Sequence, residues 1–123
     1  MTILHHVALG AKDVSRVAGF YREVLRLPQV TEHHHDDGSL RSIWLSLGLG
    51  LLMVERTSEE RRHVHGVDAG AFLIAFTWPE GLEHAADWLA SHQVATEDRS
   101  EFSLYFRDPE GNRAAISVYP LPE

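Results

Sequence analysis

The sequence predicts an α+β fold built from two βαβββ modules, and three observations support this prediction. Apolar residues alternate with polar ones in some segments, as in strands, and recur every three to four residues in others, as in helices. The resulting order of one strand, one helix and three strands occurs twice along the chain. Two short stretches also repeat: residues 7–9 resemble residues 74–76, and residues 43–45 resemble residues 104–106. Because one such module covers only one face of its sheet, the two modules are expected to pack side by side.

The first half of the chain supplies one complete module. Alternation predicts a strand over residues 3–9, and Asp13 is a suitable N-cap for an amphipathic helix over residues 14–25. The sequence Leu27-Pro28 ends this helix, because the residue before a proline avoids helical backbone angles. Three strands then follow, separated by two turns in which Asp and Gly tolerate left-handed angles. The strands are predicted over residues 29–34, 42–47 and 51–56, and the turns at residues 36–38 and 48–50.

The second half repeats this order. The predicted elements are a strand over residues 71–77, a helix over 79–91, a short strand over 94–97, and strands over 102–106 and 114–119. The last two strands are joined by the sequence Asp108-Pro109-Glu110-Gly111. Proline followed two residues later by glycine is typical of a tight turn.

Composition limits the domain organisation and the classes of partner. A chain of 123 residues is expected to form a single domain, with modules at about residues 1–57 and 69–121 joined by a polar linker. The absence of cysteine excludes disulfides and thiolate sites, and the net charge of −7 argues against nucleic-acid binding. The longest apolar run, residues 49–54, is too short to span a membrane, and residues 1–9 lack a signal-peptide pattern. We therefore expect a cytoplasmic protein with no membrane or nucleic-acid partner.

Two motifs identify a family resemblance. The stretch LHHVALGAKDVSRVAGFYREVLRL at residues 4–27 and the stretch SLYFRDPEGNRAAISVY at residues 103–119 resemble the opening and closing segments of the vicinal oxygen chelate superfamily. This superfamily includes glyoxalase I, bleomycin-resistance proteins, fosfomycin-resistance proteins and extradiol dioxygenases. The resemblance implies paired βαβββ modules that form a curled mixed sheet around a cleft, and usually a homodimer. It specifies the fold more closely than the function, because this fold supports many chemistries.

Strand alternation predicts which side chains line that cleft. The larger apolar side chains are assigned to the helix side of each strand, and their neighbours to the cleft. The expected ligand-binding residues are Trp44, Met53, Leu73, Ser103, Tyr105 and Tyr119, with His6 and Glu55 as polar groups on the same side. Such a mixed surface suits a small, partly apolar organic molecule.

The resemblance also implies a divalent metal ion, held by His or Gln and Glu from the first and last strands of each module. By position, His6 and Glu55 match two of these ligands, whereas Leu73 and Ala115 occupy the other two and cannot bind a metal. Because a catalytic ion usually has at least three protein ligands, we expect no tightly bound metal, or a weakly held Zn, Ni, Mn or Fe ion. A rearranged site that uses His63 or His65 remains open, whereas His5 is expected to face away from His6.

Two classes of function follow from these residues. In the first, the protein is an enzyme, a lyase, isomerase, transferase or dioxygenase, in which His6 and Glu55 form a divalent site or a proton-transfer pair. In the second, it is a non-catalytic, metal-free protein that sequesters a drug or binds a ligand, as bleomycin-resistance proteins do. Trp44, Tyr105 and Tyr119 would then hold a flat molecule. A hydrogen-bonded His6–Glu55 pair without a catalytic role is a third reading of these two residues.

The nine histidines include one run that resembles a metal cluster, His33-His34-His35, followed by Asp36 and Asp37. Successive strand residues point to opposite faces, so three consecutive histidines cannot all bind one ion on a regular strand. We therefore expect this run to form the solvated tip of a hairpin.

Overall fold

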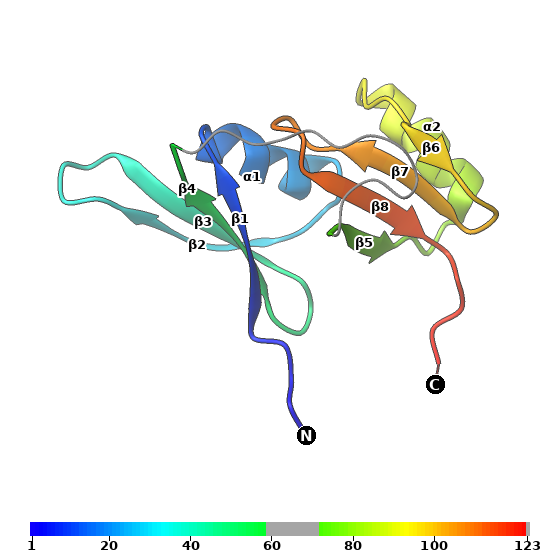
Figure 1. Cartoon of the computed structure of the whole chain (residues 1–123), viewed down its shortest axis with the longest axis horizontal. Helices are drawn as coiled ribbons and strands as arrows, with labels where there is room; N and C mark the ends of the chain where they lie inside the picture. The colour runs from blue at the N-terminus through cyan, green and yellow to red at the C-terminus, as the bar shows by residue number, and fades with distance from the viewer. Residues whose placement is uncertain (59–71, 123) are drawn as a thin grey trace. The chain divides into compact units, whose positions relative to one another are not determined.

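The structure, a computed structural model, describes residues 1–58 and 72–122. The chain divides into two compact units, Met1–Arg61 and Arg62–Glu123. The described part of each unit contains one helix and one four-stranded sheet, in the order strand, helix and three strands (Figure 1). The first unit contains β1 (His6–Ala11), α1 (Val14–Glu23), β2 (Gln29–His34), β3 (Leu40–Ser46) and β4 (Leu51–Arg56). The second contains β5 (Ile74–Thr77), α2 (Leu82–Ser91), β6 (Asp98–Arg99), β7 (Ser103–Arg107) and β8 (Arg113–Ser117).

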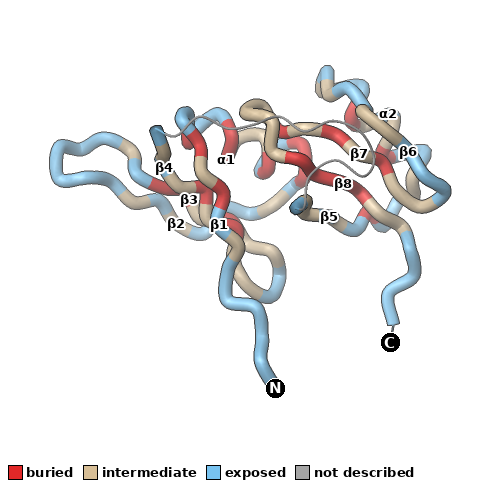
Figure 2. The backbone as a smooth tube through the Cα atoms, in the orientation of Figure 1, coloured by how far each residue is buried: buried red, intermediate tan, exposed pale blue. Residues whose placement is uncertain are grey.

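The first sheet has the strand order β1-β4-β3-β2, in which β1 runs parallel to β4 and the other pairs are antiparallel. Helix α1 packs against β1, β3 and β4 and covers one face of this sheet. The buried core lies between them and contains Leu9, Val14, Val17, Tyr21, Ile43, Leu45, Leu52 and Val54. Figure 2 shows this buried band along the strands and the helix. The apolar alternation of the sequence therefore sets which face of each strand meets the helix.

Helix α1 begins where the sequence predicts. The side chain of Asp13 accepts a hydrogen bond from the backbone N–H of Arg16 at 3.1 Å, which confirms the N-cap. The helix ends at Glu23, two residues before the predicted end. Arg26 adopts a left-handed conformation with φ of 63°, and the N–H of Leu27 donates to the carbonyl of Tyr21. The chain thus leaves the helix before it reaches Pro28.

The turn between β3 and β4 depends on glycine. Gly48 and Gly50 have φ values of 89° and 86°, in the left-handed region that favours glycine. A Cβ atom built on Gly50 would lie 2.8 Å from the carbonyl oxygen of Leu4. The turn therefore packs against the segment before β1, and the N–H of Leu51 donates to the carbonyl of His5.

The second sheet repeats the topology of the first. Its strand order is β5-β8-β7-β6, with β5 parallel to β8 and the other pairs antiparallel. Residues 7–9 and 74–76 lie in β1 and β5, and residues 43–45 and 104–106 lie in β3 and β7. The matched stretches therefore occupy equivalent strands, which confirms the internal repeat. Helix α2 packs against β7 and β8 through Ala85 and Leu89.

Some boundaries in the second unit differ from the prediction. Helix α2 starts at Leu82 rather than residue 79, because Gly81 donates its N–H to the carbonyl of Trp78 and closes a turn first. The short strand lies at Asp98–Arg99 rather than 94–97, after a segment in which Val94 still bonds back to the helix at Leu89. The strand predicted over residues 71–77 starts later in the structure, where β5 begins at Ile74. Residues 72 and 73 precede β5, and residue 71 lies outside the described residues.

The tight turn between β7 and β8 is confirmed. The N–H of Gly111 donates to the carbonyl of Asp108 at 3.0 Å. The Asp108 side chain is buried and accepts hydrogen bonds from the backbone N–H groups of Glu110 and Asn112 and from the Asn112 side chain. In the described part of the chain, neither helix combines the length and the apolar character that a membrane span needs.

Candidate functional site

The candidate site of the first unit is the face of its sheet that lies away from α1, called here the helix-free face. Strand register places the side chains of this face in three rows. The first row contains Gly10, Glu55, Ser42 and His33, the second Ala8, Met53, Trp44 and Thr31, and the third His6, Leu51 and Ser46. His6, Trp44, Met53 and Glu55 therefore share the face on which the sequence predicted them.

The register does not bring His6 and Glu55 together. His6 pairs with Leu51, whereas Glu55 pairs with Gly10 at the other end of the same two strands. The four residue steps from Leu51 to Glu55 span about 13 Å, because a parallel strand rises about 3.3 Å per residue. Within this sheet the two side chains are too far apart to share one ion or one water molecule. The roles predicted for each residue separately remain predictions.

His6 instead contacts His5. Their Nδ1 atoms are 2.8 Å apart, and the two rings meet edge to face with centroids 5.1 Å apart. In such a contact one Nδ1 donates and the other accepts, according to the tautomer of each ring. The expectation that His5 faces away from His6 is wrong, because β1 starts only at His6 and strand alternation does not apply to the residue before it. Both side chains lie in an exposed part of the chain.

A group of polar atoms is buried on the helix-free face of the first sheet. Ser42 is fully buried, and the imidazole of His33 packs against the indole of Trp44 with ring centroids 4.5 Å apart. His33 Nε2, Ser42 Oγ and Trp44 Nε1 are all buried, and none has a hydrogen-bond partner among residues 1–58 and 72–122. Glu55 lies beside Ser42 in the strand register. Buried polar atoms without partners are costly, and most proteins contain only a few.

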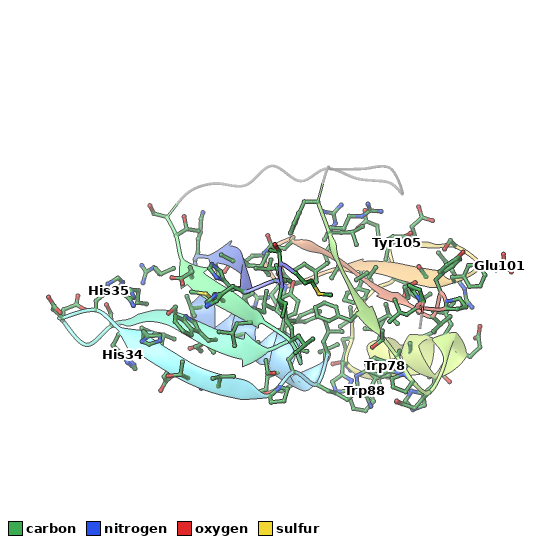
Figure 3. All side chains as sticks on the ribbon, turned by 90° about the horizontal axis from the view of Figure 1, so that it is seen from below. His34, His35, Trp78, Trp88, Glu101 and Tyr105 are labelled. Carbon is green, nitrogen blue, oxygen red and sulfur yellow. The ribbon has the colours of Figure 1, made fainter. Side chains whose placement is uncertain are left out.

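The burial of His33 corrects part of the expectation that the histidine run forms a solvated hairpin tip. His33 is half-buried within the sheet and does not belong to a solvated tip, whereas His34 and His35 are exposed near the loop between β2 and β3 (Figure 3). The ladder shifts register between His33 and His34. A shift of this kind changes which face a side chain meets, so simple alternation from the turn could not place His33. His33 and Ser42 are the site residues that sequence reasoning missed.

The helix-free face of the second sheet carries several predicted ligand residues. Tyr105 pairs with Ala115, and the guanidinium carbon of Arg113 lies 4.8 Å from the centre of the Tyr105 ring. The Ser103 hydroxyl donates to the Ser117 hydroxyl at 3.0 Å in the neighbouring row. Ser103 and Tyr105 therefore lie on the predicted face and already have intramolecular contacts.

An ion pair ties the edge of this second sheet together. The guanidinium of Arg107 donates two hydrogen bonds to the carboxylate of Glu97, at 2.6 and 3.0 Å. These bonds raise the pKa of Arg107 above its ordinary value. The ion pair keeps the guanidinium charged. It links β7, which contains Arg107, to the residue just before β6.

Tyr119 borders a pocket at the end of β5 and β8. The pocket has a volume of about 350 Å³ and is lined by Thr77, Trp78, Pro79, Gly81, Ser117, Val118, Tyr119 and Leu121. The Tyr119 ring is largely exposed and meets the ring of Phe102 edge to face, with centroids 4.9 Å apart. Leu73 is half-buried and lies just before β5. The pocket is at the lower end of the size range of small-molecule sites.

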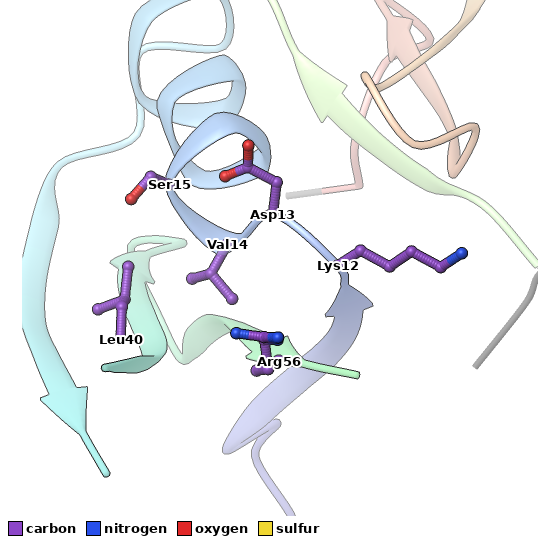
Figure 4. Close-up of a pocket in the computed structure, with 6 residues that line it drawn as sticks. All are labelled: Lys12, Asp13, Val14, Ser15, Leu40 and Arg56. Carbon is purple, nitrogen blue, oxygen red and sulfur yellow. The ribbon is translucent and has the colours of Figure 1, made fainter. Parts of the chain in front are cut away.

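A second pocket lies at the start of α1 (Figure 4). It has a volume of about 280 Å³ and is lined by Lys12, Asp13, Val14, Ser15, Leu40 and Arg56. The carboxylate of Asp13 is already used as the helix cap. None of the residues predicted to bind a ligand lines this pocket.

The side chains of the described residues do not fit the divalent ion that the sequence resemblance implies. Leu73 and Ala115 have only carbon in their side chains, and His6 and Glu55 are separated along the strands. In residues 1–58 and 72–122, no three His, Asp or Glu side chains lie close enough to hold one ion. His63 and His65, the alternative ligands, lie outside the described residues.

Comparisons with solved structures reveal similar folds. An integron cassette protein from the mobile metagenome of V. cholerae is 23% identical, with a TM-score of 0.71 over 98% of this chain and 97% of that chain. The lactoylglutathione lyase from Agrobacterium tumefaciens is 21% identical, with a TM-score of 0.67 over 92% of this chain and 90% of that chain. The E126Q mutant of the fosfomycin resistance protein FosX from Listeria monocytogenes, in complex with Mn(II) and 1S,2S-dihydroxypropylphosphonic acid, is 15% identical. Its TM-score is 0.80 over 98% of this chain and 95% of that chain. At these identities the likeness shows the fold alone.

Sequence comparisons assign the family. No curated protein sequence matches this chain. The family model for the Glyoxalase/Bleomycin resistance protein/Dioxygenase superfamily matches residues 3–116, which include both βαβββ modules. Because this match spans nearly the whole sequence and the topology agrees with it, the chain belongs to the glyoxalase/bleomycin resistance protein/dioxygenase superfamily.

Proposed function

We propose that this protein binds a small, partly apolar organic molecule on the helix-free faces of its sheets, without the help of a tightly bound metal. The observation that carries the proposal is the mixed surface of the first sheet. Trp44 and Met53 are register neighbours and supply apolar area, while His33, Ser42 and Glu55 supply polar groups in the adjacent row. Ligand pockets commonly combine apolar walls with a few polar groups that orient the ligand.

The absence of a fitting donor set favours the non-catalytic form of this function. Leu73 and Ala115 remove two metal ligands, and the register separates the remaining His6 from Glu55. A protein that sequesters a drug or another ligand needs shape and hydrogen bonds, and it does not need a Lewis acid. Trp44, Tyr105 and Tyr119 are the aromatic side chains that we assign to holding a flat ligand.

The His5–His6 contact favours an enzyme as a second candidate. Two imidazoles whose Nδ1 atoms are 2.8 Å apart can share and transfer a proton. In a lyase or isomerase, His6 would then exchange a proton with the substrate while His5 holds its ring in place. Transferase and dioxygenase chemistry would additionally need a partner group for His6, which Glu55 does not provide within the first sheet.

We also propose that the protein acts in the cytoplasm as a homodimer. Each sheet has two strands at its ends, β1 and β2 in the first and β5 and β6 in the second. Strand edges are usually covered in native proteins, and a second copy of this chain can supply that cover. The net charge of −7 supports a small-molecule ligand over a nucleic acid.

Metal analysis of tag-free protein tests the metal-free function. The protein is purified without added metal, together with a His34→Ser/His35→Ser variant that removes the exposed histidines able to bind adventitious ions. We expect less than one equivalent of metal after dialysis, and little thermal stabilisation by micromolar Zn, Ni or Mn, because stabilisation grows with ligand concentration over Kd. One equivalent retained by the double variant and lost in His6→Ala would contradict the proposal and favour the metalloenzyme.

A further inference from the structure

We propose that His33, Ser42 and Trp44, called here the polar triad, recognise a neutral ligand group that both accepts and donates hydrogen bonds, such as a primary amide or a hydroxyl. This inference rests on the proposed ligand-binding function and adds to it the site within the first sheet and the chemical class of the ligand group. The three residues come from the neighbouring strands β2 and β3 and lie on the helix-free face.

Each residue of the polar triad has one buried side-chain atom that contributes no hydrogen bond within the described residues. His33 Nε2, Ser42 Oγ and Trp44 Nε1 are buried without a partner in the described part of the chain. A buried polar atom that has lost water and gained nothing destabilises the folded state. Apolar residues at these strand positions would avoid that penalty. Three such atoms on adjacent positions of one face therefore indicate a site whose hydrogen bonds form with a ligand.

The donor and acceptor types limit the ligand group. The indole N–H of Trp44 only donates, so the ligand must present an acceptor such as an oxygen atom. The Ser42 hydroxyl and the His33 Nε2 can each donate or accept, according to rotamer and tautomer. A group with only apolar atoms would leave all three atoms without partners.

The neighbouring charge disfavours an anionic ligand. Glu55 pairs directly with Ser42 in the strand register, and directly paired side chains on one face have Cβ atoms about 5 Å apart. The other register neighbours of the triad on this face, Met53 and Thr31, are uncharged. A carboxylate or phosphate in this place would meet the carboxylate of Glu55, and no Lys or Arg is among these register neighbours. A neutral amide or hydroxyl can instead donate to Glu55 while it accepts from Trp44.

The position of His33 allows a ligand to reach the buried atoms of the polar triad. Strand β2 is the last strand of its sheet, and the ladder is irregular beside His33. The His33 ring lies against Trp44 and contributes to covering this part of the face. Because His33 takes no part in the packing against α1, its ring can rotate away from the indole and admit the head group of the ligand. The apolar part of the ligand then contacts Trp44 and Met53.

The indole N–H of Trp44 allows a direct test by NMR. The isotope-labelled chain contains three tryptophans and therefore gives three indole N–H resonances, and Trp44→Phe identifies the one that belongs to Trp44. The probes are benzamide, benzoate and fluorobenzene, which share a ring and differ in the polar group. We expect benzamide to shift the Trp44 resonance in a saturable manner, and benzoate and fluorobenzene to shift it at least about fivefold less at equal concentration.

A variant of Ser42 separates a binding role from a structural role. Ser42→Ala is expected to keep or raise the Tm, because it removes a buried hydroxyl without a partner. It should also weaken benzamide binding about fivefold, the factor that corresponds to one typical net hydrogen bond. Ser15→Ala on the exposed surface of α1 is the matched control and should leave benzamide binding unchanged.

The outcomes distinguish the inference from the function on which it rests. If fluorobenzene and benzoate perturb the Trp44 resonance as strongly as benzamide, or if Ser42→Ala binds benzamide normally, the polar triad does not recognise a neutral polar group. If the probes shift other helix-free residues such as Met53 and leave Trp44 unmoved, the ligand-binding function stands and the triad is wrong. If no probe shifts any residue on either helix-free face, the proposed function itself is contradicted.

Discussion

At the scale of single residues, two glycines adopt nearly the same left-handed backbone conformation in different surroundings. Gly38 and Gly50 have φ values of 87° and 86°, so a side chain is strained at either position. A Cβ at Gly38 would meet nothing within 4 Å, whereas a Cβ at Gly50 would lie 2.8 Å from the Leu4 carbonyl oxygen. The difference between the two positions therefore isolates the close approach of the turn to the segment before β1.

We expect Gly50→Ala to be more destabilising than Gly38→Ala. Gly38→Ala should cost about 1 kcal/mol of unfolding free energy from backbone strain alone. Gly50→Ala should cost about 2–4 kcal/mol, because the backbone must also move away from Leu4. Denaturant unfolding of both variants measures the difference. Equal losses would show that the turn does not pack against the segment before β1.

Asp108 is a residue whose polar contacts explain its burial. It accepts two backbone hydrogen bonds and one side-chain bond in the turn between β7 and β8. Asp108→Ala removes the acceptor of these three hydrogen bonds, so we expect a loss of about 2–4 kcal/mol in unfolding free energy. Asp87→Ala on the exposed side of α2 is the control and should change stability by about 0.5 kcal/mol or less. A loss no larger than that of the control would contradict this account of the turn.

At the scale of elements, the β2–β3 hairpin carries a local pH dependence at its tip. The hydroxyl of Ser39 donates to Asp37 at 2.6 Å and the backbone N–H of Ser39 donates at 2.9 Å. These two bonds, the hydroxyl bond first, lower the pKa of Asp37 below its ordinary value of 3.8. A carboxylate with a lowered folded pKa stabilises the turn above its unfolded pKa, and this contribution is lost as the pH falls through the folded pKa.

Ser39→Ala is therefore expected to raise the pKa of Asp37 towards 3.8. Side-chain carboxyl shifts in an NMR titration from neutral to acidic pH measure this directly. Ser15→Ala, outside this hairpin, is the control and should leave the Asp37 titration unchanged. An unchanged Asp37 titration in Ser39→Ala would mean that the Ser39 hydroxyl does not hold the carboxylate.

The elements also show how far the sequence could predict this structure. Helix α1, with its Asp13 cap, and strands β2 and β4 agree with the prediction because their apolar periodicity and turn residues are local signals. The His6–Glu55 distance depends on how β1 and β4 align, and these strands are about 40 residues apart along the chain. Likewise, the contact of His33 with Trp44 depends on an irregular ladder. Faces of strands are therefore predictable here, and distances between residues of the site are not.

At the scale of the whole molecule, the family assignment explains the two equivalent units, and the changes within them explain the proposed function. Both units keep the same strand order, so the scaffold of the superfamily is intact. Leu73 and Ala115, at two positions that the sequence resemblance implies for metal ligands, have side chains that cannot bind a metal. On the first sheet, the three triad residues each have a buried polar side-chain atom without a partner among the described residues. This combination is consistent with a scaffold that recognises a ligand by direct hydrogen bonds.

The assembly is the last property that the topology allows us to predict. Strands at the ends of both sheets present backbone groups that a partner can cover, and exposed apolar side chains such as Val30, Phe72 and Tyr119 add surface suited to an interface. We expect a homodimer with a two-fold interface that buries about 1,600 Å² or more in total. Light scattering of tag-free protein at tens of micromolar should give twice the mass of one chain. Val30→Lys on the end strand β2 and Lys12→Ser, a surface change outside the strands, form a matched pair. A particle of one-chain mass in the unmodified protein would refute the dimer, and dissociation by Val30→Lys alone would place β2 in the interface.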